Sequence, residues 1–431
     1  MSAPVVSGVE GRPSVLSQFA LLVRFPNFGL LWTGQVVSAV GDAFYSLALI
    51  WLVQELTGSR TMMGAISAVV SATALFGLVA GALVDRWDRR LTMLYSDVLR
   101  GAVILLIPLL WYLQRMEIWH LFVVGIAMGL LSQLFNPAKQ ALIPKLVSPE
   151  ALTGANALSQ MAFTLVMAAG YALGGTLLVL MTANQLFVFD AITFAVSAIT
   201  IFLIRVPKVA ASMPEDRTVL PNSAALAPGE QRTLLQEIAE GLRYMRSDPL
   251  VSATIPVSIL ANFIFAPLTV LLAAWARDVL GTGAQGFGFM EGSFLVGILL
   301  GNLSASGIER RVRRGRLVTW GVVCLGLPVV ALALLPNLYF NMAMLVLMGF
   351  VNGIVNIILI STFQRRVPDE MMGRFFGALI GFAMLATPLG IAIGGALADY
   401  IPIAYIFTFS GLAMAALGLT LFRKPAVAEL E

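Results

Sequence analysis

Apolar runs recur from one end of the chain to the other, with short polar connections between them. A helix of about 20 residues crosses the hydrocarbon core of a bilayer. Backbone inside lipid has to form its hydrogen bonds within its own segment, so each run is predicted to be a helix. Twelve runs meet this description: 29–53, 62–84, 92–113, 118–138, 158–181, 185–205, 250–274, 286–306, 317–335, 339–361, 376–399 and 402–422. The predicted fold is an all-α membrane protein with twelve transmembrane helices.

The composition excludes an ordinary soluble domain. Hydrophobic residues make up 59% of the chain and Asp, Glu, Lys and Arg only 12%, whereas a soluble protein carries about 25% charged residues. The net charge of +4 does not indicate a nucleic-acid partner, because the basic residues lie between the apolar runs. That placement is typical of a protein in contact with an anionic lipid bilayer.

Two rare residue types limit the chemistry. The chain has one cysteine, Cys324, and one histidine, His120. No disulfide can form within the chain, and no Cys/His metal set can be assembled. The sequence also contains no phosphate-binding loop of the form G-x-x-x-x-G-K-[ST]. It therefore predicts no metal, no cofactor and no direct use of ATP.

Lys and Arg are distributed unevenly over the two sides of the predicted membrane. With the N-terminus in the cytoplasm, 23 of the 27 fall in cytoplasmic segments; Arg60, Arg115 and Arg277 fall outside, and Arg100 lies within a span. Cytoplasmic loops of membrane proteins carry the excess of Lys and Arg. Both termini are therefore predicted to be cytoplasmic, in an inner or plasma membrane.

The longest polar connection divides the chain into two halves. The predicted organisation is a cytoplasmic N-terminal segment at 1–28, a six-helix half at 29–205, a cytoplasmic linker at 206–248, a second six-helix half at 249–422 and a cytoplasmic tail at 423–431. Within the linker, apolar residues from Leu235 to Met245 recur at helical spacing. They predict a short amphipathic helix that lies on the inner membrane surface or packs on the protein.

A single constant offset in the sequence aligns the two halves. When the sequence is aligned with itself at the offset that carries Gly170 onto Gly390, four groups of identical residues align, and many of them are glycines. One offset shared by four helices or loops indicates a duplicated six-helix half, although no single glycine match has weight. Small residues let membrane helices approach closely. The glycines predicted to serve helix packing are Gly170, Gly174 and Gly175 in the first half and Gly390, Gly394 and Gly395 in the second.

A charged turn follows the second predicted helix. It reads Gly81-Ala-Leu-Val-Asp85-Arg86-Trp-Asp88-Arg89-Arg90. This pattern resembles the signature of the major facilitator superfamily, and the second half has Ala305 in place of Asp85. The resemblance implies two pseudo-symmetric six-helix halves that open alternately to each side of the membrane around a midplane site. It also implies a cytoplasmic gate, predicted to use Gly81, Asp85, Arg86, Arg89, Arg90, Asp97 and Arg100.

Two parts of this gate have a proposed physical basis. Asp85 is expected near the N-terminal end of the eleventh helix, around Phe375, where its charge would complement the helix dipole. Asp97 and Arg100 are spaced i, i+3 and are expected to pair locally near the cytoplasmic turn. That pair either supports the gate or is purely structural.

Other stretches resemble one branch of the superfamily, which contains macrolide-efflux and enterobactin-exporter proteins. They are Trp32-Thr-Gly-Gln35, Gly41-Asp42, Leu56-Thr-Gly-Ser59, Asn136-Pro-Ala, Leu142-Ile-Pro-Lys-Leu-Val147 and Ala155-Asn-Ala-Leu158. Two features depart from the superfamily's proton-coupled drug exporters: the fourth helix has no arginine, and Gly170-Tyr171 stands where those proteins have Gly-Pro. Both departures weaken an inference of drug/proton antiport.

Three acidic residues within the spans are candidates for ion coupling. Asp42 lies near the middle of the first span, and its repeat partner is Asn262. An ionised carboxylate at the bilayer centre costs roughly 2.5–3.5 kcal/mol. Asp42 is therefore expected to face an interior cavity and to carry a coupling proton, or else to be a structural acid bonded to another helix. Asp190 and Glu291 are candidates for a second titrating or cation-binding group, but acids at the outer membrane interface that reach water are the favoured interpretation.

The remaining candidates are polar residues expected in the same cavity. Gln35, Tyr45 and Asn262 stand near aromatic residues and methionine in the sequence. A cavity wall formed by these aromatic and methionine residues would suit a bulky amphiphile better than a small ion or a sugar. The favoured function is export of a bulky hydrophobic or amphipathic small molecule, such as a drug or siderophore, by a monomeric secondary transporter driven by an ion gradient, with the proton as coupling ion.

Alternatives from the same and from other classes stay open. An importer or a flippase of a lipid-like substrate would use the same fold, because the sequence does not set the direction of transport. A polytopic membrane enzyme would need convergent acids, histidines or metal ligands, and a single histidine at a helix end argues against an enzyme. A membrane receptor is the third class.

Overall fold

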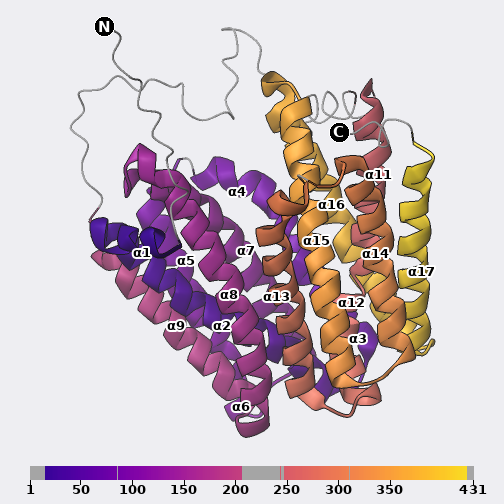
Figure 1. Cartoon of the computed structure of the whole chain (residues 1–431). Coiled ribbons are helices and arrows are strands. Elements are labelled where there is room, and N and C mark those ends of the chain that lie inside the picture. Colours follow the sequence, from indigo (N-terminus) through magenta and orange to yellow (C-terminus); the bar gives the residue numbers. More distant parts are fainter. Residues whose placement is uncertain (1–14, 85, 206–242, 244–246, 310, 425–431) are drawn as a thin grey trace, which may run out of the picture.

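The computed structural model describes residues 15–84, 86–205, 243, 247–309 and 311–424 (Figure 1). All regular elements in these ranges are helices. The first half contains α1 (Val15–Arg24), α2 (Pro26–Thr57), α3 (Arg60–Ala72), η1 (Thr73–Phe76), α4 (Gly77–Val84), α5 (Arg89–Ile104), α6 (Leu106–Tyr112), α7 (Ile118–Leu142), η2 (Ile143–Lys145), η3 (Pro149–Ala151), α8 (Leu152–Leu180) and α9 (Ala183–Leu203). The second half contains α11 (Pro249–Phe265), α12 (Leu268–Ala274), η4 (Trp275–Val279), α13 (Gly283–Glu309), α14 (Arg314–Leu334), α15 (Leu338–Arg366), α16 (Asp369–Ala398) and α17 (Ile403–Phe422).

Eleven helical segments within the described ranges are long and apolar enough to cross a membrane. The second predicted span, 62–84, differs, because it consists of the three shorter pieces α3, η1 and α4. The first break falls at Thr73, whose hydroxyl donates to the Val70 carbonyl (2.6 Å). Such side-chain bonds to the preceding turn tend to bend helices. All twelve predicted segments are helical. Besides this one, 92–113 is divided into α5 and α6, and 250–274 into α11 and α12.

The N-terminal segment contains a helix that the sequence did not predict. α1 begins at Val15 and packs against α2 and α8. Residues 1–14, and the amphipathic helix predicted from Leu235 to Met245 except for residue 243, lie outside the described residues.

Figure 1 shows the two halves as two groups of helices lying side by side. In the first group α2 packs against α8 and α9, and α5 packs against α7 and α9. In the second, α13 packs against α15, α14 against α15 and α17, and α11 against α16. The two main seams between the groups are α8 against α13 and α3 against α16.

The predicted packing glycines lie at close helix contacts. A Cβ atom added at Gly170 would lie 2.6 Å from the Cβ of Ala43, and one added at Gly390 would overlap the carbonyl oxygen of Phe263. The offset that carries Gly170 onto Gly390 also carries Ala43 onto Phe263. Gly174 contacts Phe44, and Gly394 contacts Pro267, which lies between α11 and α12. These contacts join α8 to α2, and α16 to α11 and the start of α12.

The same offset relates the seams between the halves. A Cβ atom at Gly175 would lie 2.5 Å from the Ala284 oxygen, and one at Gly395 would lie 2.7 Å from the Cα of Gly64. The offset carries Gly175 onto Gly395 and Gly64 onto Ala284. The two contacts are therefore equivalent, with the roles of the two halves exchanged. The duplication indicated by the sequence is therefore present in three dimensions.

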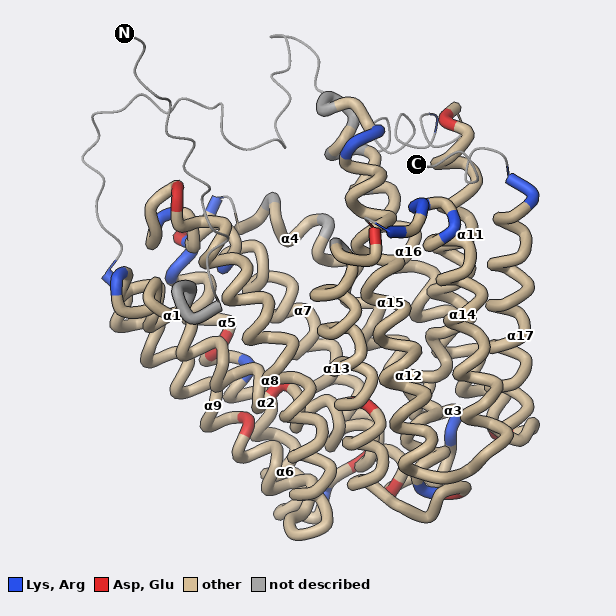
Figure 2. The backbone as a smooth tube through the Cα atoms, viewed as in Figure 1, with Lys and Arg blue, Asp and Glu red and all other residues tan. Residues whose placement is uncertain are grey.

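Large apolar side chains cover the flanks of the bundle. Leu180 is 78% exposed and Phe409 73% exposed, which suits a surface in contact with lipid. Figure 2 shows that most Lys and Arg gather at one end, where α1, the start of α16 and the end of α17 lie. We call this the basic end and the opposite end the far end.

Candidate functional site

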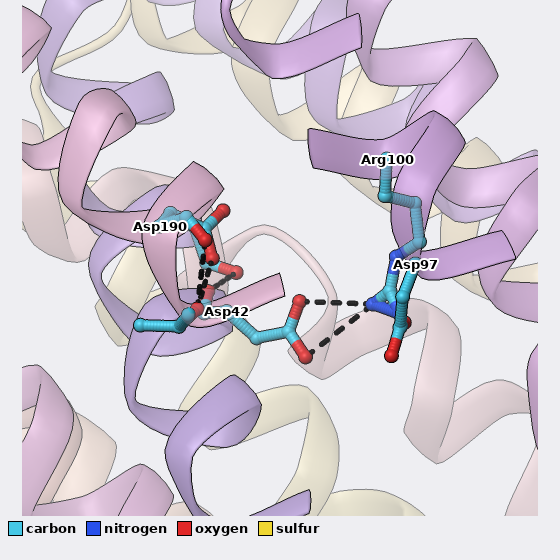
Figure 3. A network of polar contacts seen from close by, with 6 residues as sticks. Asp42, Asp97, Arg100 and Asp190 are labelled. Carbon is cyan, nitrogen blue, oxygen red and sulfur yellow. Dashed lines mark hydrogen bonds and ion pairs between the residues drawn. The ribbon is translucent and has the colours of Figure 1, made fainter. Parts of the chain in front are cut away.

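A buried ion-pair network lies inside the first half. Arg100 on α5 donates from Nη2 to Asp42 Oδ1 on α2 (3.1 Å) and from Nη1 to Asp97 Oδ1 one turn earlier (3.4 Å) (Figure 3). Its guanidinium also lies 4.2 Å from the ring centre of Phe194. Arg100 and Asp97 are almost fully buried, while Asp42 is half-buried. The network therefore connects an enclosed pair to a carboxylate that reaches open space.

The predicted Asp97–Arg100 pair is confirmed, but its predicted place is wrong. Arg100 lies in the last turns of α5, well away from the charged turn that precedes this helix, and pairs with the acid in the middle of the first span. A local i, i+3 spacing cannot reveal such a partner, because it depends on how two helices are rotated toward each other. The pair belongs with Asp42, away from the cytoplasmic turn.

Asp190 on α9 lies on the other side of Asp42 from Arg100 (Figure 3). Its exposed fraction is 0%, and Thr193 donates from its hydroxyl to Asp190 Oδ1 (3.2 Å). The side chain fills the space beside Gly41, where any Cβ atom would overlap it. Its other oxygen is buried without a hydrogen-bond partner among the described residues. The interpretation of Asp190 as an interfacial acid that reaches water is therefore wrong.

Lys139 on α7 completes what we call the polar cluster: Asp42, Asp97, Arg100, Lys139 and Asp190. Lys139, Asp42 and Arg100 line the same cavity. When every member is ionised, the cluster carries three negative charges and two positive charges. One proton added to any carboxyl group makes the cluster neutral, and an unbalanced buried charge is costly. The cluster is therefore suited to hold one exchangeable proton.

The N-half cavity opens beside this cluster and has a volume of about 280 Å³. Asp42, Arg100 and Lys139 line it together with Gln35 and Tyr45. Three of the predicted cavity residues thus share one cavity. The hydroxyl group of Tyr45 is buried without a hydrogen-bond partner among the described residues. Sequence reasoning missed Lys139, whose place just beyond the fourth predicted span suggested only a cytoplasmic loop.

The C-half cavity is larger, with a volume of about 610 Å³. All the helices from α11 to α17 contribute to its wall, and most of its lining is apolar, including Phe265 and Met348. Asn262, the repeat partner of Asp42, lies on its wall and donates to the Ser258 carbonyl (2.9 Å). Asp42 and its repeat partner therefore face two different cavities.

Glu291 supplies the charge of the C-half cavity. It is the one ionisable residue among the described residues that line this space. It is half-buried on α13, more than two turns beyond the start of that helix. The interpretation of Glu291 as an interfacial acid is therefore wrong as well, because its carboxyl group faces an internal cavity.

The predicted gate residues divide into several groups. Asp85 lies outside the described residues. Arg86 is exposed, Arg89 is half-buried, and Gly81 has open space where a Cβ atom would be. Arg90 donates from Nε to the Ile201 carbonyl (3.0 Å) and from Nη2 to the Phe202 carbonyl. It therefore caps the end of α9 within its own half.

Asp399 begins a set of contacts that joins the two halves at the far end. Its carboxylate accepts hydrogen bonds from Ser59 Oγ (3.0 Å), Arg60 N (3.0 Å) and Thr61 N (3.1 Å). An acid from the end of α16 thus caps the N-terminus of α3, where a negative charge complements the helix dipole.

Arg60 adds a second link at the same place. It donates to Asp278 Oδ2 on η4 (2.6 Å) and to the Ala398 carbonyl (2.7 Å). We call Ser59, Arg60, Asp278 and Asp399 the far-end clamp. The clamp joins the two halves at the far end. From the sequence, Arg60 was identified only as one of three basic residues on the outer side.

Residues 31–387 match the family model described as Major Facilitator Superfamily. The chain belongs to this superfamily. Among its relatives, macrolide efflux protein A of Streptococcus pyogenes is 25% identical over 388 residues, which cover 89% of this chain and 92% of the relative. Multidrug efflux pump Tap of Mycolicibacterium fortuitum is 26% identical over 415 residues, which cover 93% and 96%. The superfamily predicted from the charged turn is confirmed, and this chain is a transporter.

Solved structures agree with the major facilitator fold. A bacterial homologue of the iron transporter ferroportin, in an inward-facing state, superposes with a TM-score of 0.69 at 17% identity over 93% of this chain and 99% of that chain. A bacterial homologue of the human lysosomal transporter Spinster, described as inward-facing and unoccupied, gives a TM-score of 0.66 at 13% identity over 93% and 96%. These likenesses show the fold alone.

Proposed function

We propose that this chain is a secondary active exporter that uses a proton gradient to expel bulky hydrophobic or amphipathic small molecules by alternating access. The observation that carries the proposal is the charge of the polar cluster. Its three acids and two bases balance only when one proton is bound, and a net charge inside a membrane protein is costly. A site that binds and releases one proton beside an open cavity is what a proton-coupled cycle requires.

The C-half cavity is the proposed substrate site. Its size and apolar wall suit a drug-sized molecule, and its few polar groups would orient that molecule. The carboxyl group of Glu291 favours an amphiphile with a positive charge. The similarity to two efflux pumps, one for macrolides and one for multiple drugs, supports export as the direction and drug-like compounds as the substrate class.

The distribution of charge supports an orientation for the cycle. We assign the basic end and both termini to the cytoplasm of a plasma-membrane protein. The far-end clamp then closes the outer side, and the described conformation corresponds to an inward-facing state. In the outward-facing state, Asp85 and the gate residues near it would join the halves at the cytoplasmic side. The chain is proposed to act as a monomer, because both cavities lie within one chain.

Reconstitution into lipid vesicles with an imposed pH gradient tests the proposal. The probes are a panel of hydrophobic compounds that includes tetraphenylphosphonium, a lipophilic cation, and uncharged dyes of similar size. Wild-type protein is expected to concentrate at least one probe against its gradient. Asp42→Asn is expected to lose this accumulation but to retain exchange of the probe at equal pH, because the carboxyl group that faces the cavity is lost while the substrate cavity is intact.

Glu55→Gln is the matched control, since Glu55 is an exposed acid on the same helix α2. It should accumulate probe like the wild type. Accumulation by Asp42→Asn that still follows the pH gradient, or wild-type transport that ignores the gradient, would overturn proton coupling through Asp42. A gradient that drives the probe inward from the outer side would overturn export.

A further inference from the structure

Two exposed aromatic side chains meet where α14 begins and α17 ends. The rings of Trp320 on α14 and Phe422 on α17 lie 5.1 Å apart in an edge-to-face arrangement, although their exposed fractions are 53% and 44%. α14 and α17 pack against each other, so this pair covers the outer side of their contact at the basic end. Tryptophan and other amphipathic aromatic residues favour the boundary between the headgroups and the hydrocarbon of a bilayer. The pair therefore lies at the level expected for that boundary.

Basic side chains gather directly beyond this aromatic pair, at the basic end (Figure 2). Arg316 lies one turn before Trp320 on the same face of α14. Two further arginines precede α14, and two basic residues follow Phe422 at the end of α17. All five side chains are exposed: Arg311, Arg313, Arg316, Arg423 and Lys424.

These five charges are not neutralised within the described ranges. Glu309, the acid that precedes them in the chain, accepts from Arg314 Nε (2.5 Å) and lies 3.7 Å from Arg365 Nη2. It is therefore occupied by two other arginines. None of the five exposed cations forms an ion pair with a residue that the structure describes. Their charges are available to an anionic partner from outside the chain.

An anionic phospholipid has the matching arrangement of groups. Its phosphate lies at the bilayer surface, and its acyl chains begin directly beneath it. Arg316 lies about 6 Å nearer the basic end than Trp320, because four residues of helix separate them. A phosphate held by the guanidinium groups would thus leave its acyl chains beside the two rings. An acidic protein would use the charges but would leave the aromatic pair uncovered at the level of the lipid.

We propose that this α14–α17 surface, formed by Trp320, Phe422 and the five exposed basic residues, binds an anionic phospholipid of the adjacent leaflet. Arg316 and Arg423 hold the phosphate, and the acyl chains lie on the two rings. Other residues of the same two helices, Val318 and Leu421, line the C-half cavity. A bound lipid would therefore hold together two helices of the wall of that cavity. The surface does not depend on proton coupling or on the identity of the substrate.

Quenching of tryptophan fluorescence by brominated lipids tests the proposal. The full-length protein and its Trp320→Phe variant are reconstituted into phosphatidylcholine vesicles that contain a small fraction of phosphatidylglycerol. Bromine atoms, which quench tryptophan on contact, are placed on the acyl chains of the phosphatidylglycerol or of an equal amount of phosphatidylcholine. The difference between the two proteins gives the fluorescence of Trp320. Brominated phosphatidylglycerol is expected to quench it at least about twofold more than brominated phosphatidylcholine.

Two matched double variants separate a lipid site from general attraction to positive charge. Arg316→Gln with Arg423→Gln should lower the quenching ratio at Trp320 to about one, because the phosphate loses its partners. Arg24→Gln with Arg205→Gln removes the same charge from exposed positions in the first half and should leave the ratio unchanged. A ratio near one in the protein with its native arginines, or an equal fall in both double variants, would overturn the proposal.

Discussion

The far-end clamp gives a quantitative prediction for the balance between conformations. Asp399→Ala removes the acceptor of three hydrogen bonds, from Ser59 Oγ, Arg60 N and Thr61 N, at 3.0–3.1 Å. Loss of a helix-capping acceptor costs about 0.5–2 kcal/mol. Asp399 is exposed, so the lower part of that range applies, and its charge at the helix terminus adds about 0.3 kcal/mol.

The expected loss is therefore about 0.8–1.4 kcal/mol, specific to the conformation that is closed at the far end. A difference of this size changes the ratio of two conformations about four- to tenfold. The assay is a distance measurement between two spin labels on far-end loops, at Gln114→Cys in the first half and Pro336→Cys in the second, in a Cys324→Ser background. Asp399→Ala should increase the population of long distances by that factor.

Asp248 provides a matched control. It caps α11 by accepting from Leu250 N (2.9 Å) and Val251 N (3.0 Å) and pairs with Arg366 (2.8 Å). The chemistry resembles that of Asp399, but all partners lie within one half. Asp248→Ala should leave the far-end distances unchanged. An unchanged distribution in Asp399→Ala, or an equal change in both variants, would refute the assignment of the clamp as a conformational lock.

The clamp also has a pH dependence of known sign. Partial burial tends to raise the pKa of Asp399, but the hydrogen bonds from Thr61, Arg60 and Ser59 outweigh it and hold the pKa below its ordinary value of 3.8. A lowered pKa means that the clamped conformation favours the ionised form. The stabilisation is complete above pH 3.8 and is lost as the pH falls through the lowered value. The same spin labels should report opening of the far end only in that acidic window.

Two further predictions concern the interior of the protein. Arg100→Ala removes the ion pairs of Arg100 with Asp97 and Asp42, and breaking a buried pair costs about 3–5 kcal/mol. Thermal unfolding in detergent should therefore show a large loss of stability, whereas Arg313→Ala, at an exposed loop position, should show none. Gly175→Ala would place a Cβ atom 2.5 Å from the Ala284 oxygen, and overpacking of this kind costs about 1–3 kcal/mol of stability. Gly81→Ala, whose Cβ atom would meet nothing within 4 Å, should unfold at the same temperature as the wild type. An equal loss of thermal stability in both variants would contradict the packing argument.

The sequence predicted the features that depend on local composition. Hydropathy reports the cost of placing a segment in lipid, so the helical segments were found, together with the glycines at close contacts. The interruption at Thr73 was not predicted, because hydropathy reports whether a segment can enter lipid and not where its helix is interrupted. The helix α1 was missed because its length, 10 residues, is too short to span a bilayer.

The candidate site was predicted only in part. Gln35, Asp42 and Tyr45 share a cavity as expected. The buried positions of Asp190 and Glu291 were missed, because distance from a helix end does not tell which face of the helix a side chain occupies. The pairing of Arg100 with Asp42 joins residues 58 positions apart, and the capping of α3 by Asp399 joins residues 338–340 positions apart. Contacts of that range depend on how helices are rotated and docked, which a single sequence does not record.

The glycine seams have a kinetic consequence. At Gly64–Gly395 and at Gly175–Ala284, backbone lies directly on backbone, so no long side chains interlock between the halves there. One half can roll on the other without changing rotamers, and little side-chain freedom is gained or lost along the way. The time needed to switch access would then depend on breaking the contacts at the two ends of the molecule. The long interface between those ends would add little to the free-energy barrier of the movement.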